Sequence, residues 1–181
     1  ESRSAAIPWD KFKALENIAE TKDFLLQAPT GTDAYPLLLA AKAGNFAGVR
    51  QLIEVGESTR VSLTRDEWST FFTARDGDGK NLLNYVLEKG SQSDLDHVLV
   101  EMQKHDPSGV VLEALLSNPN PVNPLTDFLS DPSQEPRYFH VMNQLLNGIS
   151  MDFSDERRQK ARMTILLANQ ERLVELANVT D

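Results

Sequence analysis

Cysteine is absent from the sequence. This absence excludes disulfide bonds, thiol nucleophiles, thiol redox chemistry and zinc sites built on cysteine. Basic residues are also in deficit, because 27 acidic residues stand against 18 basic ones and the formal charge is −9. No basic cluster offsets this charge locally, so we expect neither nucleic acid nor an anionic membrane surface as a partner. Protein surfaces of basic or mixed charge remain compatible partners.

Long hydrophobic runs are lacking as well. No stretch of about 18 apolar residues is present, so we expect no membrane insertion. Residues 1–7 lack the basic opening and the apolar segment of a signal peptide. Together with the absence of cysteine, this favours a cytoplasmic protein.

The pattern that is present is helical. Strict alternation of polar and apolar residues, which predicts strands, is absent over any useful length, so the expected fold class is all-α. The clearest stretch runs from Pro36 to Gly56: apolar residues at 37–41 are followed by a turn at Gly44-Asn45, and then by Phe46, Val49, Leu52 and Ile53 at helical spacing. Such a helix pair cannot bury both of its apolar faces alone, which predicts neighbouring copies of the unit.

Copies of this unit are found further along the chain. Three turns, at residues 30–37, 76–83 and 118–125, begin 46 and 42 residues apart. Each turn is followed by a short helix, a second helix and, in the longer units, a third helix at 64–74 or 107–117. We therefore predict one helical repeat domain over residues 1–181: an N-terminal helical cap (1–29), repeat units 30–75, 76–117 and 118–153, and a C-terminal capping helix (154–181).

Several helix starts are predicted from single residues. Thr64 and Glu67 have the spacing of a capping box, in which each side chain accepts a backbone hydrogen bond from the other residue. Ser93 is the expected N-cap of the next second helix, and Asp106-Pro107 is the expected start of the third. The segment Asp155 to Asn178 contains neither glycine nor proline, which predicts one long terminal helix.

The residues from Pro36 to Gly56 resemble the ankyrin-repeat family. Pro36-Leu37, Ala40-Ala41, Gly44-Asn45 and Gly56 match its pattern without a gap. The second unit matches less closely and the third only through Pro124-Leu125. The resemblance implies a solenoid of about three degenerate repeats, similar to arrays in bacterial effector proteins. Because the period exceeds the 33 residues of ordinary ankyrin repeats, armadillo-like three-helix units are the alternative.

No arrangement of residues indicates catalysis or a cofactor. The loop Gly77 to Asn81 lacks the spacing of a phosphate-binding loop, and Leu87 stands where a calcium loop needs glutamate. His97, His105 and His140 would need carboxylates to bind zinc. We therefore predict no catalytic residue, no metal and no cofactor. The large aromatic residues are expected in the core, with Trp9 and Trp68 as alternative anchors for a partner.

The predicted function is a non-enzymatic protein-protein interaction module, monomeric and with a partner of unknown identity. Ankyrin arrays bind through the tips of their turns and the exposed side of each first helix. The alternative is a substrate-recruiting or regulatory domain of a larger enzyme, suggested by the start of the chain without methionine, such as a bacterial effector that acts on host proteins in the host-cell cytosol. Carried over by position, the resemblance predicts these protein-binding residues: Thr32, Ala34, Lys42, Ala43, Asp78, Lys80, Glu88, Lys89, Asn120, Val122, Ser130 and Asp131.

Overall fold

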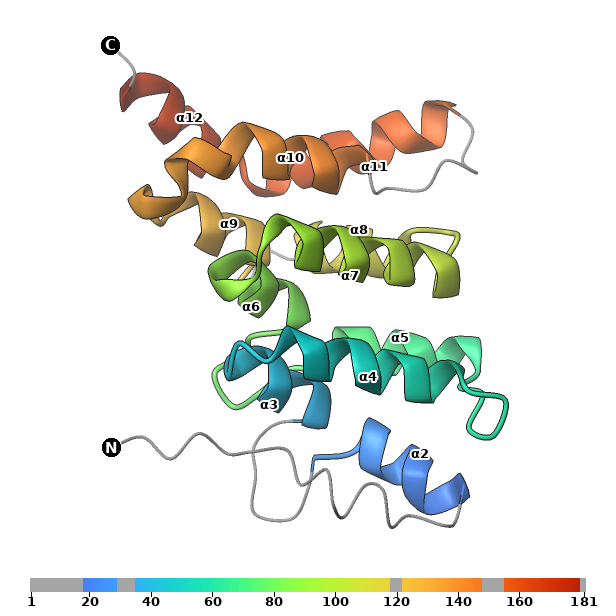
Figure 1. The fold of residues 1–181 in the computed structure, drawn as a ribbon. Helices are drawn as coiled ribbons and strands as arrows, with labels where there is room; N and C mark the ends of the chain where they lie inside the picture. The colour runs from blue at the N-terminus through green and yellow to red at the C-terminus, as the bar shows by residue number, and fades with distance from the viewer. Residues whose placement is uncertain (1–17, 29–34, 118–121, 148–154, 180–181) are drawn as a thin grey trace, which may run out of the picture. The chain divides into compact units, whose positions relative to one another are not determined.

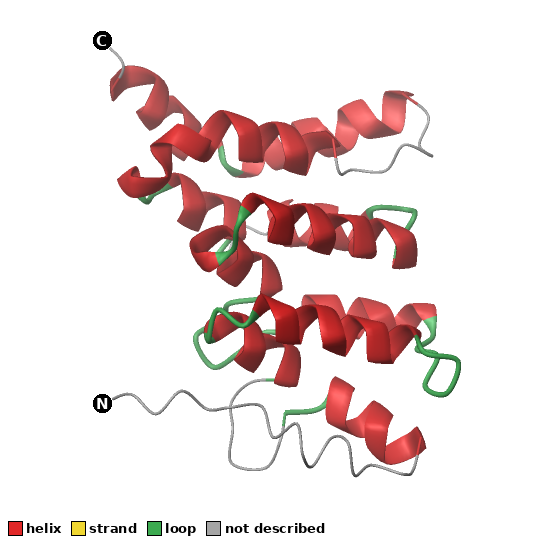
Figure 2. Ribbon diagram, in the orientation of Figure 1, coloured by secondary structure: helices red, strands yellow, loops and turns green. Residues whose placement is uncertain are grey.

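The computed structural model describes residues 18–28, 35–117, 122–147 and 155–179. Within these ranges every element of secondary structure is a helix and none is a strand (Figures 1 and 2). The predicted all-α class is therefore confirmed for the described part of the chain. No helix in that part is long and apolar enough to cross a membrane.

The chain divides into two compact units, an N-terminal unit of residues 1–94 and a C-terminal unit of residues 95–181. The N-terminal unit holds α2 (Ile18–Leu26), α3 (Pro36–Lys42), α4 (Phe46–Glu57), α5 (Arg65–Thr73) and α6 (Leu82–Lys89). Helix α7 (Gln92–His105) begins there and continues into the C-terminal unit, which holds α8 (Val110–Ser117), α9 (Pro124–Leu129), the 3-10 helix η1 (Pro132–Arg137), α10 (Tyr138–Asn147), α11 (Asp155–Ala168) and α12 (Gln170–Val179).

In the N-terminal unit, α3 packs against both α4 and α6, and α2 packs against α3, α4 and α5. The apolar run that follows Pro36 supplies the centre of this packing, since Leu37 and Leu38 have no exposed surface. Leu52 of α4 is also fully buried, and Phe71 of α5 is nearly so. Helix α3 is thus a core element, and its apolar face is covered from several sides.

Gly56 has a different role from the predicted one. It is the last residue of the predicted helix pair 36–56, but α4 continues through it to Glu57. A Cβ atom at Gly56 would lie 2.7 Å from Cη2 of Trp68 and 2.9 Å from Cδ1 of Leu63. Glycine is therefore required here by the close approach of α5, not by the end of the helix. Trp68 is only 4% exposed and stacks on Phe72, so it is a core residue and not an exposed anchor; Trp9 lies outside the described residues.

The C-terminal unit is built around α8 and α9. Helix α8 packs against α11 and α9, η1 packs against α9 and α10, and α12 packs against α9. The prediction of one long terminal helix is wrong, because the segment divides at Asn169 into α11 and α12. The side chain of Asn169 is buried and donates to the carbonyl oxygens of Leu116 (3.1 Å) and Ile165 (2.8 Å), and it accepts from Thr126 Oγ1 (2.6 Å). These contacts fix a turn that no local sequence signal indicates.

One of the three predicted helix starts is confirmed. The other two helices begin at residues other than the predicted ones. The capping box of Thr64 and Glu67 is present. At α7 the expected cap Ser93 is wrong, since Ser91 Oγ accepts from the Asp94 amide and Asp94 accepts from the Ser91 amide in return.

The helix predicted at residues 107–117 begins at Val110 and not beside Asp106-Pro107. Gly109 has a φ of +63°, which bends the chain between the proline and the helix. The Asp106 carboxylate still caps this helix, because it accepts from the Val111 amide at 2.7 Å.

Two of the predicted first helices begin with the same cap. Asn81 accepts from the amides of Leu83 (2.9 Å) and Asn84 (3.4 Å). Asn123, 42 residues later in the chain, accepts from the equivalent amides, those of Leu125 (2.9 Å) and Thr126 (3.3 Å). The earlier helix α3 has no side-chain cap, since Tyr35 occupies the position.

Candidate functional site

The candidate site lies in the N-terminal unit, where the end of α3 meets the loop before α6 and the end of α6. We call it the tip surface. It comprises Lys42, Ala43, Asp76, Asp78, Lys80, Tyr85, Glu88 and Lys89. Because α3 and α6 pack directly on each other, residues about 40 positions apart in the chain meet here.

A buried carboxylate organises the loop between α5 and α6. Asp76 is 8% exposed. Its Oδ1 accepts from the amides of Asp78 and Lys80, both at 3.0 Å. The loop also closes through its own backbone, since the Asp76 amide donates to the Lys80 carbonyl at 3.0 Å. Gly79 has a φ of +76°, a conformation that favours glycine.

The other oxygen of this carboxylate binds a tyrosine of α6. Tyr85 is 3% exposed, and its hydroxyl donates to Asp76 Oδ2 in a short hydrogen bond. Burial, together with the hydrogen bond to Asp76 and the negative charge of that residue, raises the pKa of the Tyr85 hydroxyl. The hydroxyl is therefore a permanent hydrogen-bond donor. The ammonium groups of Lys80 and Lys89 lie over its ring, 5.7 and 5.9 Å from the centroid.

Ion pairs and one backbone contact connect α3 to this loop. Lys42 Nζ lies 3.0 Å from Asp78 Oδ2 and 3.6 Å from Asp76 Oδ2. The hydrogen bond with Asp78 raises the pKa of Lys42 further above its ordinary value. Lys80 pairs with Glu88 at 3.0 Å, and Lys89 Nζ donates to the Lys42 carbonyl oxygen at 2.7 Å. Charges of both signs thus alternate over a framework held by buried hydrogen bonds.

The structure brings together half of the residues that the resemblance nominated. Five of them, Lys42, Asp78, Lys80, Glu88 and Lys89, take part in the contacts above, and Ala43 is exposed beside Lys42. Thr32, Ala34 and Asn120 lie outside the described residues.

The remaining three nominated residues belong to the C-terminal unit. Val122 is half-buried, and Ser130 is exposed at the end of α9. Hydrogen bonds from Ser133 lower the pKa of the Asp131 carboxyl.

Two residues that build the site were not predicted. The sequence shows Asp76 at the start of an Asp-Gly-Asp-Gly turn, which is a signal for a side chain that folds back on its own loop. The sequence gives no such signal at Tyr85. We expected Tyr85 to be an ordinary core aromatic residue. Its role depends on α6 placing the hydroxyl beside the carboxylate, which only the packed structure decides.

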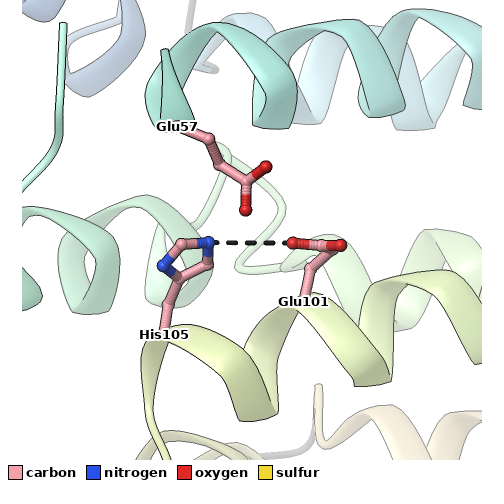
Figure 3. A group of neighbouring side chains, drawn as sticks. All are labelled: Glu57, Glu101 and His105. Atoms are coloured by element: carbon pink, nitrogen blue, oxygen red, sulfur yellow. Dashed lines mark ion pairs between the residues drawn. The ribbon is translucent and has the colours of Figure 1, made fainter. Parts of the chain in front are cut away.

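The three histidines lie on α7 and α10. His140 is exposed on α10. On α7, His105 Nε2 lies 3.7 Å from Glu101 Oε2, one helical turn away (Figure 3). Glu57, also drawn there, ends α4 in the N-terminal unit. The carboxylate–imidazole pair on α7 offers two ligands of the kinds that zinc uses.

One cavity in the C-terminal unit has a volume of about 10 Å³ and is lined by Met102, Gln103, Asp106, Gly109, Val111 and Leu112. This volume corresponds to about one water molecule, so the cavity does not hold a substrate.

Comparison with known proteins gives no relative. No protein-family model, no curated protein and no solved structure matches this chain. The function must therefore be argued from the tip surface itself.

Proposed function

We propose that the chain is a non-enzymatic protein-binding module and that the tip surface contacts the partner. The observation that carries this proposal is the connection between two successive first helices. Lys89 of α6 donates to the Lys42 carbonyl of α3, and Lys42 in turn pairs with Asp78. Residues that the resemblance nominated in two predicted units are thus in contact with one another.

The repeat architecture that we propose is an ankyrin-like solenoid whose units carry a third helix. The support is the order of short, second and third helices, which recurs as α3–α4–α5 and α6–α7–α8. A second support is the identical cap of Asn81 and Asn123 at the start of a first helix. Armadillo-like units remain the alternative, because they also contain three helices in a similar length.

The tip surface has properties that suit recognition of a mixed-charge protein segment. Its outer charges are accessible, since the side chains of Asp78, Lys42 and Glu88 are 68%, 49% and 44% exposed. Below them, the bonds of Asp76 hold the loop in one conformation before binding, which reduces the entropy lost on association. Exposed charges steer encounter and are screened by salt. We therefore expect binding to weaken as ionic strength rises.

The experiment is affinity capture with the whole chain as bait, quantified by mass spectrometry at about 50 and 300 mM salt. The test variant is Lys80→Glu with Lys89→Glu, which reverses two charges of the tip surface. The matched control is Arg60→Glu with Lys104→Glu, which makes the same change in net charge at exposed positions elsewhere. We expect a protein that the wild type and the control retain at low salt and that the test variant loses.

Two results would contradict the proposal. One is retention of the same proteins by the test variant and the wild type, which removes the tip surface from the contact. The other is equal loss from both variants, which assigns the binding to net charge alone. Circular dichroism of each variant establishes that the helical content is unchanged before either result is interpreted.

A further inference from the structure

One face of α7 in the C-terminal unit carries three side chains of the kinds that bind metal ions. His97, Glu101 and His105 follow one another at intervals of four residues, and side chains four residues apart are neighbours on a helix. Imidazole nitrogen and carboxylate oxygen are both ligands of zinc and of other divalent transition metals. Two ligands at this spacing can hold one ion between successive turns, as the paired histidines of helical zinc motifs do.

Two polar atoms of this face lack the hydrogen bonds that buried groups normally make. Glu101 Oε2 and His97 Nε2 are both buried, and neither has a hydrogen-bond partner in the part of the chain that the structure describes. The side chain of Glu101 is 12% exposed, and that of His105 is 15% exposed. Buried polar groups in folded proteins are nearly always hydrogen-bonded. A buried carboxylate oxygen of this kind therefore points to a ligand that supplies the missing interaction.

The separation of Glu101 and His105 fits a shared ion better than a direct hydrogen bond. His105 Nε2 lies 3.7 Å from Glu101 Oε2 (Figure 3). An N–H···O hydrogen bond spans about 2.7–3.2 Å. Two ligands that each lie about 2.1 Å from a tetrahedral ion are about 3.4 Å apart. The observed separation is thus close to the one that an ion between the two side chains would impose.

Lys104 is a competing cation at the same carboxylate. Its Nζ lies 3.5 Å from Glu101 Oε2, and its side chain is 54% exposed. Ion pairs of exposed lysines are held weakly, so this ammonium group can turn to solvent when another cation binds. A divalent ion carries twice the charge of the lysine and can coordinate the carboxylate and the imidazole together.

We propose that Glu101 and His105 form a binding site for a divalent transition metal ion such as Zn²⁺, with one ligand from each side chain. The pair supplies half the ligands of a structural zinc site. Half the binding free energy of such a site corresponds to a dissociation constant of about 1–200 µM. This site is separate from the tip surface and does not depend on the proposed function. It departs from the sequence-based expectation that the chain binds no metal.

The experiment is isothermal titration of zinc chloride into the whole chain without an affinity tag, near neutral pH. We expect one zinc ion per chain with an affinity in the range above. Glu101→Gln and His105→Ala each remove one ligand and should weaken binding at least about tenfold. Asp96→Asn makes the same charge change at an exposed position of α7, and His140→Ala removes an exposed histidine of α10. Both controls should stay within about twofold of the wild type.

The pH dependence separates a metal site from a simple ion pair. Protons compete with zinc for the imidazole nitrogen, so zinc binding should weaken as the pH falls from about 7 to about 5.5. An ion pair between histidine and glutamate would instead strengthen, because the histidine becomes charged. Circular dichroism establishes that each variant keeps its helical content.

Three results would overturn the proposal. The first is a wild type that binds no zinc at concentrations up to about 1 mM. The second is a Glu101→Gln or His105→Ala variant that binds zinc as the wild type does. The third is a loss in Asp96→Asn as large as that in Glu101→Gln, which would assign the binding to the acidic surface in general.

Discussion

Replacing Asp76 by alanine removes the carboxylate on which the loop before α6 depends. The side chain accepts two amides, from Asp78 and Lys80, and the hydroxyl of Tyr85, and it lies 3.6 Å from Lys42 Nζ. Asp76 and Tyr85 are both buried, so water cannot simply take the place of the lost acceptor. We expect this variant to lose stability and to disorganise the tip surface at the same time.

The size of the effect follows from the groups left without a partner. An unsatisfied buried hydroxyl costs about 1–3 kcal/mol, and the Tyr85 hydroxyl belongs to this class. The two loop amides are part-buried and can recover some hydration, so we assign them about 0.5–1 kcal/mol each. The total for Asp76→Ala is then about 3 kcal/mol. Asp78→Ala removes an exposed carboxylate from the same loop and should cost less than about 1 kcal/mol.

Urea unfolding followed by tryptophan fluorescence measures this difference, because Trp68 lies in the core of the same unit. A Trp9→Phe background assigns the signal to Trp68 alone. Tyr85→Phe and the double variant complete a cycle, in which the two losses should fall short of additivity by about 1–2 kcal/mol. The reasoning is refuted if Asp76→Ala costs no more than Asp78→Ala, or if the two changes are additive.

Three further predictions concern other parts of the fold. Gly56→Val should cost about 2–3 kcal/mol in urea unfolding, because its side chain overlaps Trp68. The pKa of Glu67 is lowered by the Thr64 amide and by Lys22 from its ordinary value of 4.5, so its contribution is present above that pH and is lost as pH falls. In urea unfolding Glu67→Gln should therefore cost about 0.5 kcal/mol at pH 7 and progressively less as the pH falls through the lowered pKa of Glu67. Asn169→Ala should cost about 2–3 kcal/mol by circular dichroism, because it removes three hydrogen bonds made by a buried side chain.

Each of these has a matched control. Gly44→Ala changes a glycine with a φ of +71° that has no heavy atom within 4 Å of the added Cβ, so its cost of about 1 kcal/mol comes from the backbone alone. Asp66→Asn removes a neighbouring acidic residue of the same first turn, and it should show a smaller dependence on pH than Glu67→Gln. Gln170→Ala alters an exposed residue beside Asn169 and should leave the dichroism transition unchanged.

Part of the candidate site followed from the sequence. The turns and the apolar period of the helices predicted where the helices lie, and the resemblance to ankyrin repeats nominated Lys42, Asp78 and Lys89 by position. Their mutual contacts could not be derived, because the donation from Lys89 to the Lys42 carbonyl depends on the distance between two packed helices. Tyr85 was assigned to the core, which is correct, but its hydroxyl acquires a role only through Asp76.

By itself the sequence determined the features that depend on neighbouring residues. These include the helical class, the capping box of Thr64 and Glu67, the short first helices and the asparagine positions at which α6 and α9 start. Tertiary structure alone decided where distant segments meet. It divided the terminal helix at Asn169 through bonds to Leu116 and Thr126, and it required Gly56 to lie under Trp68. The physical reason is that helix propensity and capping act over one or two turns, whereas packing and buried hydrogen bonds depend on contacts that form only when the chain has folded.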